Sequence, residues 1–302
     1  MTAKVILNPY SNRWNSQKRW HEAEAALKAA GVDFHLAVSE KKGHIVELAE
    51  QAALQRFSPI IVAGGDGSIG DAANGLMRAA RSTFSTSPIP PLGLLPTGSA
   101  NDLVYALGLP VDLNEAAQVI AAGKTKAMDV GKLNDRYFVN NSAAGLEPYV
   151  TIKHEKIHSI KGMARYLVAA VQAIMDQPEW MGAVTWDGGE YSGKFSLISV
   201  GNGRRTGGFY MTPHADPFDG KLTLAFGYRA SRLGLFQALP RAFNEDKGSY
   251  VEMEGMREVH TTRVSIHLDK PSPAHTDGEL FSSWIQDFEY EILPSCLHVI
   301  VK

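Results

Sequence analysis

The chain has 302 residues and a formal net charge of −2, with 44% hydrophobic and 21% charged residues. This length exceeds one ordinary hydrophobic core, so two domains are expected. The nearly balanced charge excludes a general electrostatic attraction to nucleic acid, and the composition is that of a soluble globular protein.

The cysteine content and the N-terminus bear on the cellular compartment. The single cysteine, Cys296, cannot form an internal disulfide and suits a reducing cytosol. The chain passes from Met1 almost directly into an apolar run at 5–7, without the longer apolar core of a signal peptide. No apolar run approaches the roughly 20 residues that span a bilayer, so any lipid chemistry would occur at a membrane surface. We therefore expect a cytoplasmic protein that associates with membranes transiently.

The first half of the chain alternates strand-like and helix-like segments. This βαβα alternation predicts an α/β domain with a mostly parallel sheet and a ligand at the carboxyl ends of the strands. A segment rich in serine and proline, 82–91, is predicted to be a surface loop. The predicted strands are 5–7, 32–38, 59–63 and 92–95, and the predicted helices are 20–30, 43–57, 69–80 and two that begin near Asp102 and Asn114.

Strand-like segments predominate after Gly123. We expect a β-rich, mainly antiparallel second domain over 127–290, after a first domain over 1–126, with 291–302 packing back on the first. The predicted strands are 137–140, 183–186, 195–200, 221–227, 263–268 and 288–293, and the predicted helices are 163–176 and 233–243.

A glycine cluster follows the apolar, β-branched strand 59–63. Residues 64–68 read Gly-Gly-Asp-Gly-Ser, and apolar residues then recur at helical spacing from Ile69. A strand that ends in glycines and leads into a helix presents backbone N–H groups and the helix dipole to an anion. The sequence therefore predicts a phosphate-binding turn here.

A second turn of similar composition follows the strand at 92–95. Residues 96–102 read Pro-Thr-Gly-Ser-Ala-Asn-Asp and again combine glycine, hydroxyls and a carboxylate. Taken alone, Asp66 of the first turn would be interpreted as a helix-capping aspartate. Two such turns at the ends of adjacent parallel strands would instead grip a polyphosphate from both sides.

Two other nucleotide motifs fit less well. Residues 65–70 match the dinucleotide fingerprint G-x-G-x-x-G, but no Asp or Glu occurs over 72–101 to hold a ribose. Residues 123–125 resemble the end of a P-loop, but Gln118 stands where its first glycine should be. Any ATP would therefore bind without a P-loop.

Residues 154–158 match the zinc-protease motif H-E-x-x-H. Lys153, Lys156 and Lys161 oppose a dication, and the sequence offers no third ligand. We therefore favour a charged segment with two chance histidines, His154 and His158.

The chain as a whole resembles the diacylglycerol kinase catalytic-domain family, which includes bacterial soluble lipid kinases and the sphingosine and ceramide kinases. Each matching motif is weak, but their order and spacing are specific. The motifs are Asn8-Pro9-Tyr10-Ser11, 64–68, 95–102, Asp129-Val130-Gly131, Phe138-Val139-Asn140, Gly201-Asn202-Gly203, Gly207-Gly208, Asp219-Gly220 and Asp277-Gly278-Glu279.

The resemblance implies an α/β domain that carries ATP, a β-rich domain, and a nucleotide cleft between them. It implies that Glu279 accepts the proton of a lipid hydroxyl, with Asp277 beside it, and that Mg²⁺ binds the Asp219 side chain and the carbonyls of Asp216 and Lys221. Asp66 would help to hold a catalytic Mg²⁺, through water. The implied ATP-binding residues are Asn8, Pro9, Tyr10, Ser11, Asn12, Ser39, Gly64, Gly65, Asp66, Gly67, Ser68, Ile69, Gly70, Ser99, Asn101 and Asp102.

The sequence departs from the family pattern at the nucleotide site. Ser39, Ser68 and Ser99 stand for the usual threonines, which keeps each hydroxyl. Gly70-Asp71 replaces a common Asn-Glu pair, so a side-chain contact near the phosphates is lost or supplied by Asp71. These changes bear on affinity more than on reaction type.

The sequence says less about how a lipid would reach the protein. Lys153, Lys156, Lys161 and Arg165 precede the apolar segment 166–174 and would suit anionic lipid. The alternative, which we favour for the apolar residues, is the core stripe of an amphipathic helix formed by Tyr166, Leu167, Ala170, Val171 and Ile174.

The favoured function is an ATP-dependent lipid kinase that phosphorylates diacylglycerol or another lipid alcohol. An NAD kinase, which shares the Gly-Gly-Asp-Gly turn, would not readily explain 95–102 together with 277–279. A catalytically inactive nucleotide- or lipid-binding regulator is the alternative from another class. The acceptor, its acyl chains, regulation and the oligomeric state, with a homodimer as one arrangement, are not readable from the sequence.

Overall fold

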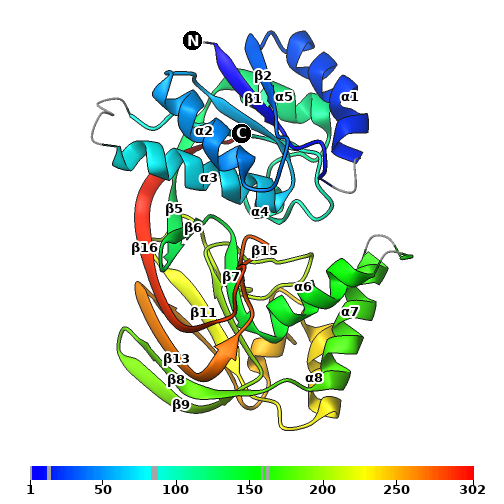
Figure 1. The fold of residues 1–302 in the computed structure, drawn as a ribbon, viewed down its shortest axis with the longest axis vertical. Helices are drawn as coiled ribbons and strands as arrows, with labels where there is room; N and C mark the ends of the chain where they lie inside the picture. The colour runs from blue at the N-terminus through cyan, green and yellow to red at the C-terminus, as the bar shows by residue number, and fades with distance from the viewer. Residues whose placement is uncertain (1, 12–14, 83–87, 158, 161–162) are drawn as a thin grey trace. The chain divides into compact units, whose positions relative to one another are not determined.

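The computed structural model describes residues 2–11, 15–82, 88–157, 159–160 and 163–302. The chain forms two compact units (Figure 1). Unit 1 comprises Met1–Val130 and Ser295–Lys302, and unit 2 comprises Gly131–Pro294. Each unit has its own core and is described by itself below.

Unit 1 is built on a parallel sheet in the order β2-β1-β3-β4. The apolar runs that predict these strands are buried, with Val5 opposite Ile61 and Ile61 opposite Gly93. The last part of β16 (Ile285–Ile300) adjoins β4 in parallel through Val299 and Leu92. The predicted parallel sheet is confirmed. Its strands are β1 (Ala3–Leu7), β2 (Phe34–Val38), β3 (Ile60–Gly64) and β4 (Leu92–Pro96).

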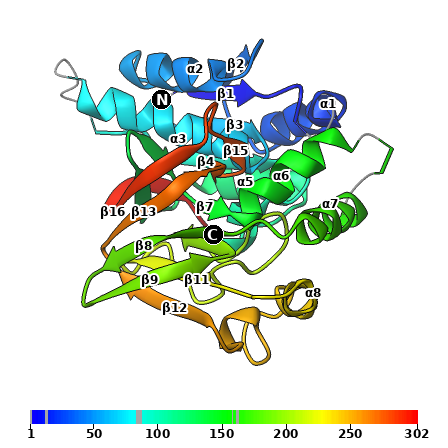
Figure 2. The same ribbon diagram turned by 60° about the horizontal axis from the view of Figure 1, so that its bottom comes forward.

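Helices flank this sheet (Figures 1 and 2). Trp20 and Leu27 from α1 and Leu113 and Ile120 from α5 share one apolar cluster with the strands. Helix α3 begins at Asp66, three residues before the predicted start, because the extended Gly65 already serves as its N-cap. The helices of unit 1 are α1 (Asn15–Ala29), α2 (His44–Leu54), α3 (Asp66–Arg81), α4 (Asp102–Ala106) and α5 (Leu113–Ala122).

Gly75 lets α2 and α3 pack closely. A Cβ atom on Gly75 would overlap the carbonyl oxygen of Val46 and lie 2.8 Å from the Cβ of Ala49. We expect Gly75→Ala to lower the free energy of unfolding by about 1–3 kcal/mol, because overpacking forces the helices apart. Urea denaturation measures this, with the exposed Ala80→Ser on the same helix as control; equal midpoints for the two variants would contradict the prediction.

Strands β5 (Thr125–Leu133) and β16 run from one unit into the other. In unit 1 the buried Asp129 carboxylate accepts a hydrogen bond of 2.7 Å from the backbone N–H of Ser295, which joins the two strands. In unit 2 a Cβ atom on Gly131 would strike the ring of Phe138. The Asp129-Val130-Gly131 motif is thus explained by packing.

Cys296 lies on this returning strand, with its sulfur 4.0 Å from the sulfur of Met77. Burial raises the pKa of the Cys296 thiol to about 11. The thiolate is the reactive form, so at pH 8 we expect iodoacetamide to alkylate the folded protein about 100-fold more slowly than the unfolded chain. The rate should rise as the pH approaches 11. Equal alkylation rates in the folded and unfolded states would contradict a buried Cys296 thiol with a raised pKa.

Unit 2 is a sandwich of antiparallel strands, as predicted. One sheet has the order β12-β11-β10-β7-β14-β15, and the other contains β16-β13-β8-β9 with the β5–β6 pair. Phe138, Phe195, Phe226 and Phe288 lie in the core. The strands are β6 (Arg136–Phe138), β7 (Asn141–Gly145), β8 (Trp180–Trp186), β9 (Gly189–Phe195), β10 (Leu197–Gly201), β11 (Leu222–Gly227), β12 (Met256–Thr261), β13 (Arg263–Ser272), β14 (Ala274–Thr276) and β15 (Glu279–Leu280).

Among its described residues, unit 2 also has three helices and a short 3-10 turn. Helix α7 (Met163–Asp176) matches its prediction, α8 (Arg232–Arg241) is close to it, and the turn is η1 (Tyr250–Glu252). Helix α6 (Leu146–Lys156) was not predicted, because its apolar residues follow no helical period and Pro148 lies near its start. Within the described residues, no helix is both long and apolar enough to cross a membrane.

The predicted core stripe of α7 needs one correction. Ala170 and Ile174 are buried and Tyr166 and Leu167 are partly covered, but Val171 is 41% exposed. The buried side of the helix is formed by Ala169, Ala170, Ala173 and Ile174, and Val171 lies outside that face.

Candidate active site

The predicted nucleotide residues of unit 1 that the structure describes lie at or just after the ends of β1, β2, β3 and β4. Asn8, Ser39 and Thr97 each follow a strand directly, and each donates a backbone hydrogen bond to a neighbouring strand. The acceptors are the carbonyls of Ala63 at 3.0 Å, Leu7 at 2.9 Å and Gly64 at 3.2 Å, respectively. These bonds align the four turns along one edge of the sheet.

Asn8 is tied to the first glycine turn. Its Nδ2 donates to Oγ of Ser68 at 2.8 Å, and its Oδ1 accepts from the N–H of Tyr10 at 3.1 Å. Because Ser68 receives a hydrogen bond, its own hydroxyl proton remains available for donation. Ser68 lies in the first turn of α3, where the helix dipole favours an anion.

Asp66 joins the two glycine turns. Its Oδ1 accepts a hydrogen bond from the N–H of Leu103 at 3.0 Å, in the first turn of α4. Asp66 therefore caps the start of the neighbouring helix α4. Loss of water around this carboxylate raises the pKa of Asp66, and the backbone N–H groups of Leu103 and Asp102 lower it in part.

The two turns also touch through their glycines. A Cβ atom on Gly65 would lie 3.2 Å from Cα of Gly98, and one on Gly98 would overlap Cα of Gly65. A side chain at position 98 would force the backbones apart, and one at position 65 would meet a tight contact. The turns therefore form one interlocked structure, which we call the paired phosphate turns (64–68 and 96–102).

Two hydroxyls beside these turns were missed by the sequence interpretation. Oγ1 of Thr97 and Oγ of Ser16 hydrogen-bond to each other, and both residues are fully buried. Nη1 of Arg19 also donates to the Pro96 carbonyl at 3.1 Å. These contacts hold the start of α1 against the second turn. Thr97 was recognisable as a hydroxyl in the turn, but no pattern marked Ser16.

The other predicted nucleotide residues differ in exposure. Ser99 is exposed, whereas Asn101 and Asp102 are buried. Ile69 is buried in the core, so a nucleotide contact there would have to use its backbone. Asn12 lies outside the described residues. Among the rest, Tyr10 Oη donates to the Glu40 carbonyl at 3.0 Å, Ser39 Oγ donates to the Lys41 carbonyl at 3.2 Å, and the Gly70 carbonyl accepts from Asn74.

In unit 2, Asp277 and Gly278 form the turn of the β14–β15 hairpin. Their φ angles are +50° and +82°, the conformation of a two-residue type I′ turn. Thr276 pairs with Glu279 across the hairpin. This turn places a half-buried Glu279 on β15.

The Asp277 carboxylate binds backbone N–H groups of a distant segment. It accepts hydrogen bonds from the N–H groups of Val139 at 3.0 Å, Asn140 at 2.8 Å and Asn141 at 3.0 Å, and only 5% of the residue is exposed. Three donors fix this side chain in place. Asp277 thus anchors the hairpin to the link between β6 and β7, a use that its position beside Glu279 did not indicate.

The predicted Mg²⁺ ligands of unit 2 lie in one exposed turn. Oδ1 of Asp216 accepts from the N–H of Phe218 at 3.0 Å, and Oδ1 of Asp219 accepts from the N–H of Lys221 at 2.9 Å. Carboxylate and carbonyl oxygens are the donors that Mg²⁺ prefers. The residues present therefore fit such an ion.

The two rejected motifs have structural roles. Gly123 adopts φ +65° as the C-cap of α5, and β5 starts at Thr125. The His154 ring stacks on Tyr166 with centroids 3.8 Å apart, and His158 lies outside the described residues. Among the described residues, no group of three His, Cys, Asp or Glu side chains has the arrangement of a metal site.

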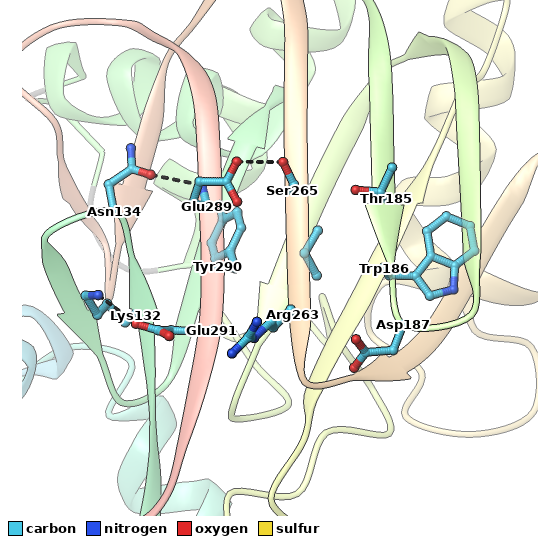
Figure 3. A pocket seen from close by; sticks show the side chains of 11 residues that line it. Lys132, Asn134, Thr185, Trp186, Asp187, Arg263, Ser265, Glu289, Tyr290 and Glu291 are labelled. Atoms are coloured by element: carbon cyan, nitrogen blue, oxygen red, sulfur yellow. Dashed lines mark hydrogen bonds and ion pairs between the residues drawn. The ribbon is translucent and has the colours of Figure 1, made fainter.

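A polar cleft of about 520 Å³ lies on the outer side of the β16-β13-β8 strands (Figure 3). Several of its charged groups are engaged with neighbours: Lys132 pairs with Glu291 at 2.6 Å, and Ser265 donates to Glu289 at 2.6 Å. None of the predicted site residues is among the residues that line it. We interpret it as the solvated face of a curved sheet whose other face forms the core.

Comparisons with known proteins agree with the fold of each unit. A family model described as the diacylglycerol kinase catalytic domain matches residues 2–133, and one described as the YegS C-terminal NAD kinase beta sandwich-like domain matches residues 140–301. A diacylglycerol kinase of Staphylococcus aureus is 30% identical over 224 residues, which are 74% of this chain and 69% of that protein.

Two further relatives match over nearly the whole chain. A diacylglycerol kinase of Bacillus subtilis is 26% identical over 283 residues, 92% of this chain and 89% of that protein. The crystal structure of a diacylglycerol kinase from Bacillus anthracis has a TM-score of 0.77 at 25% identity, covering 100% of this chain and 97% of that one. The chain belongs to the diacylglycerol kinase family.

Proposed function

We propose that this protein is an ATP-dependent kinase that transfers the γ-phosphoryl group to the hydroxyl of a lipid, with diacylglycerol as the acceptor and phosphatidic acid as the product. The observation that carries the proposal is the pair of phosphate turns, interlocked through Gly65 and Gly98 and through the Asp66–Leu103 bond. The names of the relatives support the acceptor.

The nucleotide half of the reaction is assigned to unit 1. The phosphates would lie against the paired phosphate turns, where backbone N–H groups and the first turn of α3 favour negative charge. Asn8 and Ser68 already hold each other at 2.8 Å, so the Ser68 hydroxyl is oriented before ATP binds. Such preorganisation lowers the cost of ordering the site.

Mg²⁺ is proposed at two places. Asp66 would help to hold the Mg²⁺ ion that accompanies ATP, because carboxylate oxygens are ligands that Mg²⁺ prefers. Asp219, with the carbonyls of Asp216 and Lys221, would hold a second ion in unit 2. Bound Mg²⁺ supplies positive charge that offsets the charge developing on the phosphates during transfer.

Glu279 is proposed as the general base. The lipid hydroxyl would give its proton to the Glu279 carboxylate while its oxygen bonds to the γ-phosphorus and the bond to the ADP oxygen breaks. Asp277 is the poorer candidate, because three backbone N–H groups already bind its two oxygens. Asp277 would instead fix the hairpin that carries Glu279.

Transient binding to a membrane surface in the cytoplasm is part of the proposal. Of the four cations considered, Lys153 forms an ion pair with Asp176 at 2.6 Å, and Arg165 donates to the His154 carbonyl at 2.8 Å. Both side chains already bond to residues of α6 and α7, so neither is held ready for a lipid headgroup. Lys161 lies outside the described residues.

The test is transfer of labelled γ-phosphate from ATP to diacylglycerol in mixed micelles, with Mg²⁺ or with EDTA. Labelled phosphatidic acid that forms with Mg²⁺ and not with EDTA is the expected result. Measurable ATP binding without transfer to any lipid would overturn the proposal in favour of a regulatory protein.

A further inference from the structure

The strand that carries Glu279 is short. β15 contains two residues, Glu279 and Leu280, and pairs with β14 at the end of its sheet. A pairing of only two residues on each strand holds β15 weakly in place. The position of Glu279 therefore depends on the Asp277 anchor and on how firmly β14 is held.

A buried polar chain holds β14 from one face of the sheet. His275 of β14 is fully buried, and its Nε2 lies 3.2 Å from Oε1 of Glu147. Oε2 of Glu147 accepts from Ser199 at 3.0 Å, and Ser199 accepts from Asn141 at 2.9 Å. The chain thus connects α6 to β10, β7 and β14, and we call it the Glu147 network.

The strand register explains how these side chains meet. His275 lies opposite Ala143 on β7, and Ala143 lies opposite Ser199 on β10, so the three side chains share one face. The small Ala143 leaves room above the middle strand. Glu147 fills that room from α6 and bonds to the strands on both sides.

The start of α6 fixes Glu147. The N–H of Gly145 donates to Oγ of Ser272 at 2.9 Å, and the N–H of Leu146 donates to the Ser196 carbonyl at 3.0 Å. A Cβ atom on Gly145 would lie 2.9 Å from that same carbonyl oxygen, so the backbone is pressed onto the sheet. Glu147 therefore has a rigid base.

The other face of the sheet holds β14 as well. Oγ of Ser142 donates to the His275 carbonyl at 2.8 Å and lies 3.2 Å from Oη of Tyr290. Burying an acid costs free energy, and apolar packing often gives equal stability. A polar network at this position therefore suggests a function beyond stability.

We propose that Glu147 and His275 are positioning residues for phosphoryl transfer: they hold β14 so that Glu279 keeps its place. This inference rests on the proposed role of Glu279. Displacing a base by about 1 Å costs up to about 100-fold in rate. Loss of the network should therefore lower kcat about 10- to 100-fold and leave the KM for Mg-ATP within twofold.

The experiment compares His275→Leu with the double variant Glu147→Leu/His275→Leu. The single variant leaves the buried Glu147 carboxylate without its histidine and should be destabilised, whereas the double variant removes both polar partners and should recover much of the thermal stability. A purely structural role predicts that kcat recovers with stability. The proposal predicts that kcat stays low in both.

The matched control is Thr223→Val. Thr223 lies on β11 of the same sheet, is buried, and its Oγ1 is 3.1 Å from Nδ1 of His260, away from β14. This variant also loses a buried side-chain hydrogen bond. It should keep the wild-type kcat, which separates the network from a general loss of buried polar contacts.

Hydrogen–deuterium exchange over 274–281 provides a readout that needs no activity. Both network variants should raise exchange at the hairpin, and Thr223→Val should not. Wild-type kcat or unchanged hairpin protection in the double variant would overturn the inference. A wild-type protein that transfers no phosphate would refute the proposed function, while the exchange data would still decide whether the network holds the hairpin.

Discussion

Glu279→Gln is expected to lower kcat for lipid phosphorylation by about 10²- to 10⁴-fold, the usual contribution of a general base. The amide has the shape of the carboxylate but cannot take the proton of the acceptor hydroxyl. Initial rates with Mg-ATP and diacylglycerol micelles, together with titration of Mg-ATP, measure the effect. Mg-ATP affinity and the melting temperature should stay at their wild-type values, because Glu279 lies on a hairpin of unit 2.

The control for this variant is Glu190→Gln, an exposed acid on β9 of the same unit. It should keep full activity. A fully active Glu279→Gln protein would contradict the assignment of the base, and a variant that has also lost its hairpin protection would point to a structural effect.

Gly98→Ala is expected to lower kcat/KM for Mg-ATP about 100-fold. The new Cβ atom would overlap Cα of Gly65, which is backbone and cannot rotate away, so the paired phosphate turns must separate. Misplacing the bound phosphates by about 1 Å is expected to lower the rate by about that factor. Overpacking should also lower the free energy of unfolding by about 1–3 kcal/mol.

Gly31→Ala separates these two effects. Gly31 has φ +77° and nothing within 4 Å of its missing Cβ, so alanine there strains the backbone at a cost of about 1 kcal/mol without touching the turns. It should bind Mg-ATP as the wild type does. If both glycine variants bound Mg-ATP equally, the interlocked turns would not be the phosphate site.

The sequence was most informative where local pattern and backbone chemistry agree. The apolar, β-branched run 59–63, which leads into a glycine cluster, predicted both a buried strand and the turn at its end. The missing acid over 72–101 separated this turn from a dinucleotide site. Helix α6 escaped prediction because its burial comes from contacts with the sheet and not from a periodic apolar face.

The detailed roles of the acids could not be predicted, because they depend on contacts between distant residues. Asp66 bonds to Leu103, 37 positions away, and Asp277 binds N–H groups that lie 136 to 138 positions earlier. Glu147 and His275 are 128 positions apart and carry no motif. A motif identifies which acids matter, but strand order decides what each one touches.

The most direct test of the lipid kinase assignment is the partition of labelled phosphate after reaction with a mixture of diacylglycerol, monoacylglycerol, sphingosine, ceramide, phosphatidylglycerol, undecaprenol and NAD. We predict label in the organic phase that co-migrates with phosphatidic acid and is lost in Glu279→Gln. Label confined to the aqueous phase on NAD would contradict the assignment and identify the protein as an NAD kinase.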